Sequence, residues 1–307
     1  MLNESLFNRF RETVAQQQLG VYGVHVYQEG RGTVAHRWRS DDRTCLYSAS
    51  KTFAALAVGI CQEEGRLSIE DKALDFFPQY RDIASAGSED ITLRDLLHMC
   101  SGKLFSMFDV PWDSPVLRQT DWAELFFRLH VTAKPGTHFW YSNPSTYLLG
   151  RVVECVTGQN LRDYAKPRLF DKLNIFNPQW HTCPQGHTLS YSGLYLTTEE
   201  LSRLGRLLLD GGVYEGKQVV NAAFVQALHE DIVDSNPDNG SDPEGAVGYG
   251  YQVWRCRREG SYRADGSYGQ YSIVVPDKRA VVTITGHRNS LWLDTVRAAF
   301  SDIVELL

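Results

Sequence analysis

Long apolar runs, runs of positive charge and paired cysteine motifs are all missing from this chain. Its longest apolar stretches fall far short of the roughly 18 residues that a membrane span needs. The first residues, MLNESLFNRFRETVAQQQ, carry charges where a secretory signal needs an apolar segment. We therefore expect a cytoplasmic protein with no membrane partner.

Positive charge is the minority charge, with 31 Lys and Arg against 37 Asp and Glu and a net charge of −6. This balance argues against nucleic acid or an anionic membrane surface as a partner. Hydrophobic residues make up 43% of the 307 residues, which is typical of a soluble globular enzyme. We expect a small-molecule partner, and the sequence leaves the oligomeric state open.

The motifs of common cofactor and metal enzymes are also absent. There is no G-x-x-x-x-G-K-[ST], no G-x-G-x-x-G after a strand, no H-E-x-x-H and no G-x-S-x-G elbow. Segment 234–240 has acidic residues at alternate positions, but its glycine falls one place late for a calcium loop and no glutamate closes it. We interpret it as a solvated loop and predict neither a metal nor a cofactor.

The cysteines are dispersed, with no C-x-x-C pair and no Cys/His cluster at zinc spacing. We interpret them as unpaired, mostly buried thiols; an exported chain with three disulfides is the alternative. The residues are Cys45, Cys61, Cys100, Cys155, Cys183 and Cys256.

Apolar periodicity predicts the elements of the N-terminal part. Residues 6–14 have helical spacing, and 20–27 and 33–38 read as two strands. The EGRG turn between these strands predicts a hairpin. The nearly all-apolar segment 51–64 predicts a helix that is buried on most sides.

The remainder of the chain changes in texture twice. Residues 68–188 predict short helices interrupted by prolines, and the strand signal then returns at 249–254, 271–276 and 280–285. Residues 291–307 predict a closing amphipathic helix. Strands at both ends of the chain indicate one antiparallel sheet that both ends complete.

This pattern predicts an α/β (α+β) fold, in which an antiparallel sheet flanked by helices lies beside a helical lobe. Residues 1–67 and 189–307 would form the sheet-containing lobe, and residues 68–188 the mainly helical one. A site is expected in the cleft between the two lobes.

A serine and a lysine stand three residues apart at the start of the predicted buried helix, in Ser48-Ala49-Ser50-Lys51. On a helix they lie on one face. A lysine amine acts as the base for a serine hydroxyl only where burial and cationic surroundings lower its pKa. The N-terminus of a helix favours the neutral amine, and its free N–H groups suit a developing oxyanion.

A second polar group, Tyr141-Ser142-Asn143, follows a Lys-Pro-Gly-Thr turn and precedes Pro144. A tyrosine near a lysine can relay a proton, and an asparagine amide can hold a substrate carbonyl. The alternative is a packed tyrosine and a turn-forming asparagine. Together, Ser48-x-x-Lys51 and Tyr141-x-Asn143 resemble the first two motifs of the serine β-lactamase and penicillin-binding protein superfamily.

The resemblance is to the class C-like branch, with its esterases, D-amino-acid peptidases and 6-aminohexanoate-dimer hydrolases, and it covers roughly residues 20–290. Residues 91–102 (ITLRDLLHMCSG) are similar to a family segment that usually has His and Thr where Met99 and Cys100 stand. Residues 135–158, and 192–197 after them, resemble further family segments. The expected fold is therefore β-lactamase/transpeptidase-like.

The resemblance implies a role for each motif residue. Ser48 would be the acylated nucleophile, and its N–H would form half of the oxyanion hole. Lys51 would be its base partner, Tyr141 would assist proton transfer to the leaving group, and Asn143 would contact substrate. Whether Lys51 or Tyr141 is the general base stays open, as does the activator of the deacylation water.

The chain departs from the family at the third motif, K-T-G or H-x-G on a strand facing the serine. The best counterpart is Ala264-Asp265-Gly266, in a register that is open by a few residues. Gly266 would let the strand approach the substrate, and the Ser267 N–H would complete the oxyanion hole. No lysine or histidine stands first to bind a substrate carboxylate, although Arg263, Arg288 or His287 lies near enough in sequence to supply charge.

These observations lead to three hypotheses. The first is a serine hydrolase that cleaves an ester or small amide through an acyl-enzyme. The second is a β-lactamase or D-aminoacyl peptidase proper, and the third is a non-catalytic binding protein of the same fold. Among the aromatic residues, Trp140 or Tyr191 is expected to touch the cleft.

Overall fold

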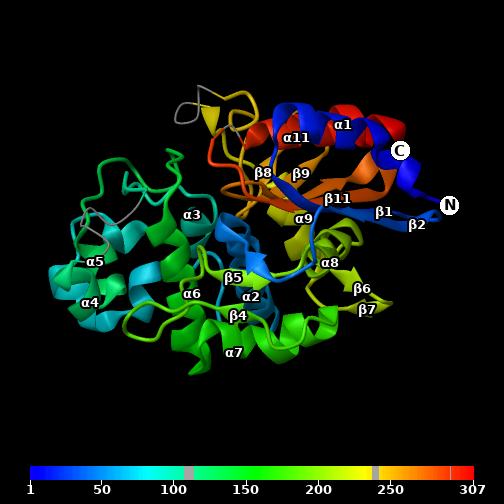
Figure 1. The fold of residues 1–307 in the computed structure, drawn as a ribbon. Coiled ribbons are helices and arrows are strands. Elements are labelled where there is room, and N and C mark those ends of the chain that lie inside the picture. The colour runs from blue at the N-terminus through cyan, green and yellow to red at the C-terminus, as the bar shows by residue number, and fades with distance from the viewer. Residues whose placement is uncertain (107–113, 237–241, 291) are drawn as a thin grey trace.

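A six-stranded antiparallel sheet with the strand order β2-β1-β11-β10-β9-β8 organises the fold (Figure 1). The computed structural model describes residues 1–106, 114–236, 242–290 and 292–307. The strands of this sheet are β1 (Val21–Gln28), β2 (Gly32–Arg37), β8 (Trp254–Arg255), β9 (Tyr262–Gly266), β10 (Gln270–Val275) and β11 (Ala280–Gly286). Both ends of the chain contribute to the sheet, as the sequence predicts.

The described helices surround this sheet and extend to one side of it (Figure 1). They are α1 (Asn8–Gln17), α2 (Ser50–Glu63), α3 (Leu93–Leu97), α4 (Pro115–Gln119), α5 (Trp122–Arg128), α6 (Asn143–Thr157), α7 (Leu161–Ala165), α8 (Thr198–Leu209), α9 (Ala222–Glu230) and α11 (Leu293–Asp302). Five short strands complete the set: β3 (Thr44–Cys45), β4 (Gln179–Trp180), β5 (Leu194–Leu196), β6 (Val213–Tyr214) and β7 (Lys217–Gln218).

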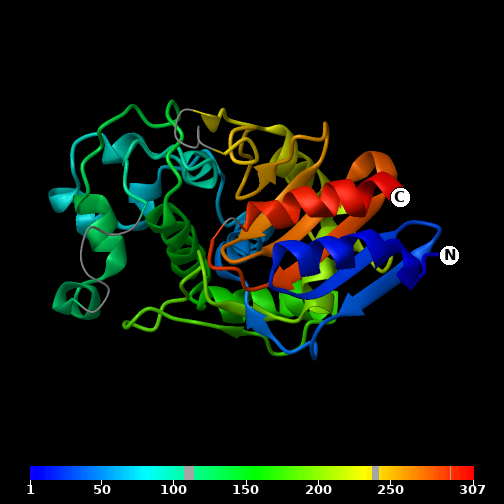
Figure 2. The ribbon, with the colours of Figure 1, turned by 45° about the horizontal axis from the view of Figure 1, so that its top comes forward.

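The two faces of the sheet are covered by different helices. Helices α1 and α11 lie side by side on one face (Figure 2), where Phe10 and Val296 pack against Val24 and Ile273. Helix α8 crosses the other face, and Val274 and residues of α2 belong to the core on that side. Alternate residues of one strand therefore enter different cores, as the period of two requires.

The buried helix α2 connects the sheet to the helical part of the molecule. Every residue from Ser50 to Cys61 is buried, because α6 packs along one side of the helix and β9 lies across its start. The preceding segment is held by backbone pairing of β3 with β5, in which Thr44 faces Leu196. The position of the start of α2 is thus fixed from three directions.

The predicted elements of the N-terminal part agree with the structure. The hairpin forms as β1 and β2, and α2 spans Ser50–Glu63 where residues 51–64 were expected to be helical. Residues 4–14 begin with a 3-10 turn (Glu4–Phe7) and continue as α1. The mixed antiparallel sheet and helices confirm the predicted fold class, and the division into two lobes with those boundaries stays a prediction.

The expected strand at 249–254 is wrong for most of its length. Only Trp254 belongs to a strand, β8, and the residues before it form a turn in which the Gly250 N–H donates to the Val253 carbonyl. Gln252 has a φ of +61°, which an extended strand does not permit. The alternating apolar pattern arises here because both sides of the turn are buried.

Two further differences occur near the C-terminal end. The sequence does not predict strand β9, because Arg263 and Asp265 interrupt the apolar pattern there. The closing helix is shorter than 291–307: α11 covers Leu293–Asp302 and a 3-10 turn follows, while residue 291 lies outside the described residues. The proposed solvated loop at 234–240 also lies partly outside them.

All six cysteines lie among the described residues; none of them forms a disulfide, and four are buried, as predicted. Among the described residues, no helix is long and apolar enough to cross a membrane.

Gly205 of α8 allows this helix to pack closely on the sheet. A Cβ at this position would lie 2.4 Å from Val281 Cγ1 and 2.5 Å from Ser272 Oγ. We expect Gly205→Ala to lower the free energy of unfolding by about 1–3 kcal/mol, since overpacking outweighs the helix propensity of alanine.

Urea unfolding followed by circular dichroism measures this change. Glu63→Ala, at an exposed position of α2, is the control and should stay within about 0.5 kcal/mol of the parent protein. A Gly205→Ala variant as stable as that control would contradict the close packing of α8.

Candidate active site

Ser48 and Lys51 meet where a short turn enters the buried helix. A 3-10 turn, Tyr47–Ala49, follows β3 and leads directly into α2. Lys51 Nζ lies 3.1 Å from Ser48 Oγ, and the lysine is only 1% exposed. The predicted serine–lysine pair is therefore in hydrogen-bonding contact.

Two further oxygen atoms contact the same amine. Lys51 Nζ donates to Asn143 Oδ1 at 2.7 Å and to the Tyr191 carbonyl oxygen at 3.0 Å. A neutral amine has two N–H groups and one lone pair. If the two N–H groups serve Asn143 and Tyr191, the lone pair faces the hydroxyl of Ser48.

Burial lowers the pKa of Lys51 well below its usual value, and the nearby Asp265 carboxylate raises it by a smaller amount. Desolvation disfavours the charged ammonium. The Asn143 amide and the Tyr191 carbonyl, which accept hydrogen bonds from the amine, carry no charge that would stabilise it. The environment thus favours the neutral form that accepts a proton.

Asn143 is the first residue of α6, and Tyr141 stands two residues before it. Tyr141 forms a hydrogen bond with Ser48, and its ring centroid lies 4.9 Å from Lys51 Nζ. Burial raises the pKa of Tyr141 above its usual value, an effect larger than the lowering by Ser48. The tyrosine therefore keeps its proton at neutral pH and can donate it.

An aromatic cluster holds Tyr141 in place. Its ring stacks on Trp254 with centroids 5.5 Å apart and an interplanar angle of 22°, and Tyr249 meets both rings edge-on. Phe139 packs against Tyr249 and Trp254 as well. Trp254 stands more than 100 residues after Tyr141, so local spacing carries no signal for this contact.

Two tyrosines adjacent to the expected catalytic backbone have left-handed conformations. Tyr47, before Ser48, has a φ of +47°, and Tyr268, after Ser267, has a φ of +68°. Their ring centroids are 4.7 Å apart. Left-handed backbone at bulky residues costs about 1–3 kcal/mol and occurs preferentially at functional sites. Sequence reasoning missed both residues because the strain depends on the packed structure.

Gly266 brings β9 against the turn that carries Ser48. A Cβ on Gly266 would lie 2.1 Å from the Leu46 carbonyl oxygen and 3.2 Å from the Ala49 nitrogen. Only glycine fits this approach, so the segment Ala264–Gly266 lies beside the turn that carries Ser48, with Gly266 at the contact. Ser267, the next residue, lines the same pocket as Ser48.

Arg263 does not offer a free charge to this pocket. Its Nε donates to Asp265 Oδ2 at 2.8 Å, and its two terminal nitrogens donate to the carbonyl oxygens of Arg255 and Glu244. The side chain is 1% exposed. The guanidinium is therefore committed to β9 and the neighbouring loop.

The other two cations considered from the sequence have different partners. His287 stacks on Tyr268 and contacts Asn289 Oδ1, and Arg288 lies 3.5 Å from an Asp294 carboxylate oxygen. Neither lines the pocket at Ser48. None of these three candidates thus offers the pocket a free cation in place of the lysine or histidine of the third motif.

The pocket at Ser48 has a volume of about 270 Å³. Its wall combines the side chains of two serines, aromatic rings and carboxylates. The lining residues are Ser48, Tyr141, Asp242, Gly245, Trp254, Arg263, Asp265, Ser267, Trp292 and Leu293. Tyr191 reaches the site through its carbonyl contact with Lys51, whereas Trp140 is not part of this lining.

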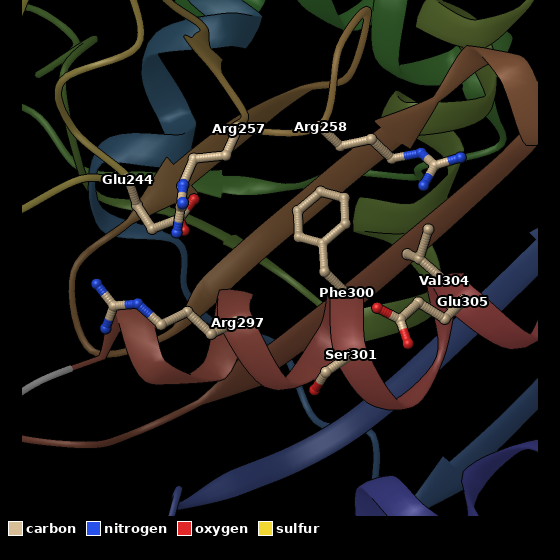
Figure 3. Close-up of a pocket in the computed structure, with 8 residues that line it drawn as sticks. All are labelled: Glu244, Arg257, Arg258, Arg297, Phe300, Ser301, Val304 and Glu305. Carbon is tan, nitrogen blue, oxygen red and sulfur yellow. The ribbon is translucent and has the colours of Figure 1, made fainter.

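A second pocket lies on α11, away from the serine–lysine pair. Figure 3 shows it between the arginines Arg257, Arg258 and Arg297, with Phe300 at its centre. Its lining contains one hydroxyl, Ser301, and no lysine. Within the described parts of the chain, no group of three His, Cys, Asp or Glu side chains could hold a metal ion.

The chain belongs to the beta-lactamase family, whose model matches residues 6–302. The fold and the adjacent Ser48, Lys51 and Tyr141 agree with this membership. Among solved structures, a putative 6-aminohexanoate-dimer hydrolase from Bacillus anthracis superimposes with a TM-score of 0.77 at 20% identity, covering 96% of this chain and 80% of that one. EstCE1, a hydrolase with promiscuous acyltransferase activity, gives 0.77 at 17% identity, covering 98% of each chain. At these identities the likeness shows the fold alone.

Curated relatives include hydrolases of different substrates. The chain is 25% identical over 270 residues to a 6-aminohexanoate-dimer hydrolase of Paenarthrobacter ureafaciens, covering 83% of this chain and 67% of that protein. It is 27% identical over 192 residues to a lovastatin esterase of Penicillium rubens, covering 56% of this chain and 48% of the esterase. The chain therefore matches only about half of the esterase, and it is similar to hydrolases of this superfamily.

The lowered pKa of Lys51 predicts a specific dependence of stability on pH. Between the folded pKa and the ordinary value of 10.5, the unfolded chain binds a proton at Lys51 that the folded chain does not bind. The free energy of unfolding must then rise with pH in this window. In Lys51→Met that contribution is absent.

We therefore expect the stability difference between the parent protein and Lys51→Met to shift in favour of the parent from pH 7 to pH 10. Chemical unfolding at each pH measures it, and Lys217→Met on the exposed strand β7 is the control. A difference that does not change with pH would show that the amine of Lys51 is charged in the folded protein.

Proposed function

We propose that this protein is a serine hydrolase that cleaves an ester or a small amide through an acyl-enzyme on Ser48. The observation that carries the proposal is the set of three contacts at Lys51 Nζ, with Ser48 Oγ, Asn143 Oδ1 and the Tyr191 carbonyl. A neutral amine that donates its two N–H groups to Asn143 and to the Tyr191 carbonyl would direct its lone pair at the serine hydroxyl. An amine so placed activates the nucleophile.

The pKa directions suggest how the two proton carriers divide the work. Lys51, whose pKa is lowered by burial, accepts the proton of Ser48 as the oxygen attacks the carbonyl carbon. Tyr141, whose pKa is raised by burial, donates a proton to the leaving oxygen or nitrogen. The proton on Lys51 then passes to Tyr141 and restores its phenol. In the second step a water molecule attacks the acyl-enzyme, and the same proton transfers run in the opposite direction, which returns a proton to Ser48.

The backbone N–H groups of Ser48 and Ser267 would bind the oxyanion. The close approach of Gly266 to the Leu46–Ala49 turn supports this assignment, because it brings β9 to the side of the nucleophile. Removal of one such donor typically costs about 2.7–4 kcal/mol in transition-state stabilisation.

The third motif favours ester or amide hydrolysis over β-lactam hydrolysis. Ala264 stands where the family places a lysine or histidine, and the adjacent Arg263 is bound to Asp265. The relatives that are named an esterase and a 6-aminohexanoate-dimer hydrolase support the same reading. We further infer a cytoplasmic location, supported by six cysteines that form no disulfide.

Ser48→Ala should abolish the turnover of short-chain nitrophenyl esters and the mass increase produced by a fluorophosphonate probe. Lys51→Met should lower kcat by a factor on the order of 10³ or more, because the hydroxyl loses its base. Both are measured by steady-state kinetics and intact mass spectrometry.

Lys103→Met provides the matched control. Lys103 is a second buried lysine, 2% exposed, whose pKa burial lowers to about 7, but it contacts Ser85 and Ser88 and does not contact Ser48. It should keep the kcat of the parent protein. Equal losses in the two lysine variants, or labelling that persists in Ser48→Ala, would contradict the assignment.

A β-lactam should be a poor substrate. Nitrocefin carries a carboxylate, which no lysine or histidine of the third motif is present to bind, so we expect kcat/KM for nitrocefin to be at least about 10²-fold below that for the best nitrophenyl ester. Ala264→Lys should raise the ratio of nitrocefin to ester turnover. Rapid nitrocefin hydrolysis by the parent protein would favour the β-lactamase alternative.

A further inference from the structure

We propose that Gln252 is a positioning residue, which holds the helices that carry Lys51 and Asn143 at their observed separation. Gln252 is not among the residues that line the pocket at Ser48, so it would act through these helices and not through contact with a substrate. The inference rests on the proposed function, because it concerns the transfer of a proton from Ser48 to Lys51. Its support comes from the hydrogen bonds, the burial and the backbone conformation of this one glutamine.

The side-chain amide of Gln252 joins the end of α3 to α6. The glutamine is only 3% exposed. Its Nε2 donates to the carbonyl oxygens of Leu97, at 2.7 Å, and of Leu96, at 3.2 Å. These carbonyls belong to the last turn of α3, where the regular helical N–H partners are missing. Its Oε1 accepts from Thr146 Oγ1 of α6 at 2.7 Å. The amide therefore uses its donors and its acceptor to connect two helices.

The backbone of Gln252 connects α2 to the same group of helices, in which α6 packs against both α2 and α3 (Figure 1). Its carbonyl oxygen accepts from Thr52 Oγ1 at 2.8 Å. Thr52 follows Lys51 in α2, and Thr146 lies one turn after Asn143 in α6; both threonines are fully buried. One residue is thus bound to both of the helices whose first turns meet in the 2.7 Å hydrogen bond between Lys51 and Asn143.

Gln252 also fixes the turn that carries two of the rings around Tyr141. Its φ of +61° is a left-handed conformation, which a residue other than glycine keeps only where its surroundings stabilise it. The hydrogen bonds to α3 and α6 provide that stabilisation. Tyr249 precedes Gln252 in this turn and Trp254 follows it, and both rings contact the ring of Tyr141. The conformation of Gln252 therefore sets the place of the two rings that hold the phenol.

Loss of the amide would leave buried polar groups short of a partner. The Thr146 hydroxyl and the Leu97 carbonyl would each lose a hydrogen bond, and buried groups in that state move or take in water to recover one. Water near the start of α2 would weaken the desolvation that lowers the pKa of Lys51. The amine would then keep its proton to a higher pH. The other titratable side chains that face it are Tyr141, Tyr191 and Asp265.

Gln252→Met keeps the length of the side chain and removes its donors and its acceptor. We expect kcat for a nitrophenyl ester to fall about tenfold, because small displacements of catalytic groups are costly. KM should change by less than about twofold, because no residue of the pocket wall is altered. The acidic limb of the kcat/KM profile should move to higher pH, because Lys51 keeps its proton longer. An unchanged kcat with an unchanged pH profile would overturn the proposal.

A second buried glutamine provides the matched control. Gln28, the last residue of β1, is 8% exposed, and its Nε2 also donates to two backbone carbonyls, those of Lys278 and Leu307. Gln28→Met should lose stability and keep the kcat and the pH profile of the parent protein. Equal changes in the two glutamine variants would assign the effect to general destabilisation and overturn the role of Gln252.

Thr146→Val tests the same connection, including the case in which Gln252→Met does not fold. The substitution keeps the shape of the side chain and removes one hydrogen bond to Gln252. It should change kcat and the pH profile in the same direction by a smaller factor, and it should add little to the effect of Gln252→Met, because both changes remove the same contact. Parent values of kcat and of the pH profile in Thr146→Val would overturn the proposal.

Titration of Lys51 by heteronuclear NMR separates this inference from the proposed function, because the measurement needs no turnover. A pKa of Lys51 that is higher in Gln252→Met than in the parent protein, and unchanged in Gln28→Met, would support the positioning role even if no ester were hydrolysed. Equal pKa values of Lys51 in Gln252→Met and in a parent protein that hydrolyses esters would overturn the positioning role and leave the hydrolase standing.

Discussion

The burial of one lysine amine against one serine hydroxyl is the constraint on which the rest of the site depends. Lys51 is almost fully buried within the first turn of α2. An ammonium in this position would cost several kcal/mol of desolvation without a paired carboxylate at contact distance. The structure around it supplies neutral oxygen atoms from Asn143 and Tyr191 in its place, and these satisfy a neutral amine.

The fold brings these partners together from distant parts of the chain. Ser48 and Lys51 belong to the start of α2, Asn143 to the start of α6, and Tyr191 to the segment before β5. The third side is closed by β9, where Gly266 touches the Leu46–Ala49 turn. A site assembled in this way requires the helices and the sheet to keep their relative positions. The close packing at Gly205 of α8 and at Gly266 of β9 helps to hold them there.

Strain accumulates around the same point. Tyr47 and Tyr268, which stand next to Ser48 and Ser267 in the chain, have left-handed backbone conformations, and so does Met99, whose carbonyl accepts from the backbone N–H of Trp140. Such conformations persist only where surrounding packing stabilises them. The aromatic cluster and the sheet provide that packing, so that the turn bearing Ser48 is fixed before any substrate arrives.

Sequence reasoning reached the residues whose signal is local. The spacing of Ser48 and Lys51, the apolar composition of α2 and the alternation in β1, β10 and β11 each follow from a few neighbouring residues. The contacts of Trp254 and of the Tyr191 carbonyl could not be predicted, because each depends on how distant segments pack. The strand expected at 249–254 failed for a related reason: a turn buried on both sides has the same apolar alternation as a strand.

The third motif shows the limit of a resemblance. The resemblance indicated Ala264-Asp265-Gly266, but Gly266 and Asp265 have different consequences for the site. Gly266 lies against the Leu46–Ala49 turn, whereas Asp265 lines the pocket at Ser48 and raises the pKa of Lys51 by less than burial lowers it. The backbone at Gly266 thus has the close approach that the resemblance predicts, while the side chains before it differ from the family motif.

The most direct test of this account is a titration of the Lys51 side chain by heteronuclear NMR, with the signal assigned by its absence from Lys51→Met. The account predicts that Lys51 titrates far below its ordinary value of 10.5 and that the amine is largely neutral at the pH at which esters are cleaved. A Lys51 signal that titrates near 10.5 in the folded protein would mean that the amine is charged in the resting site, and the assignment of Lys51 as the base for Ser48 would be wrong.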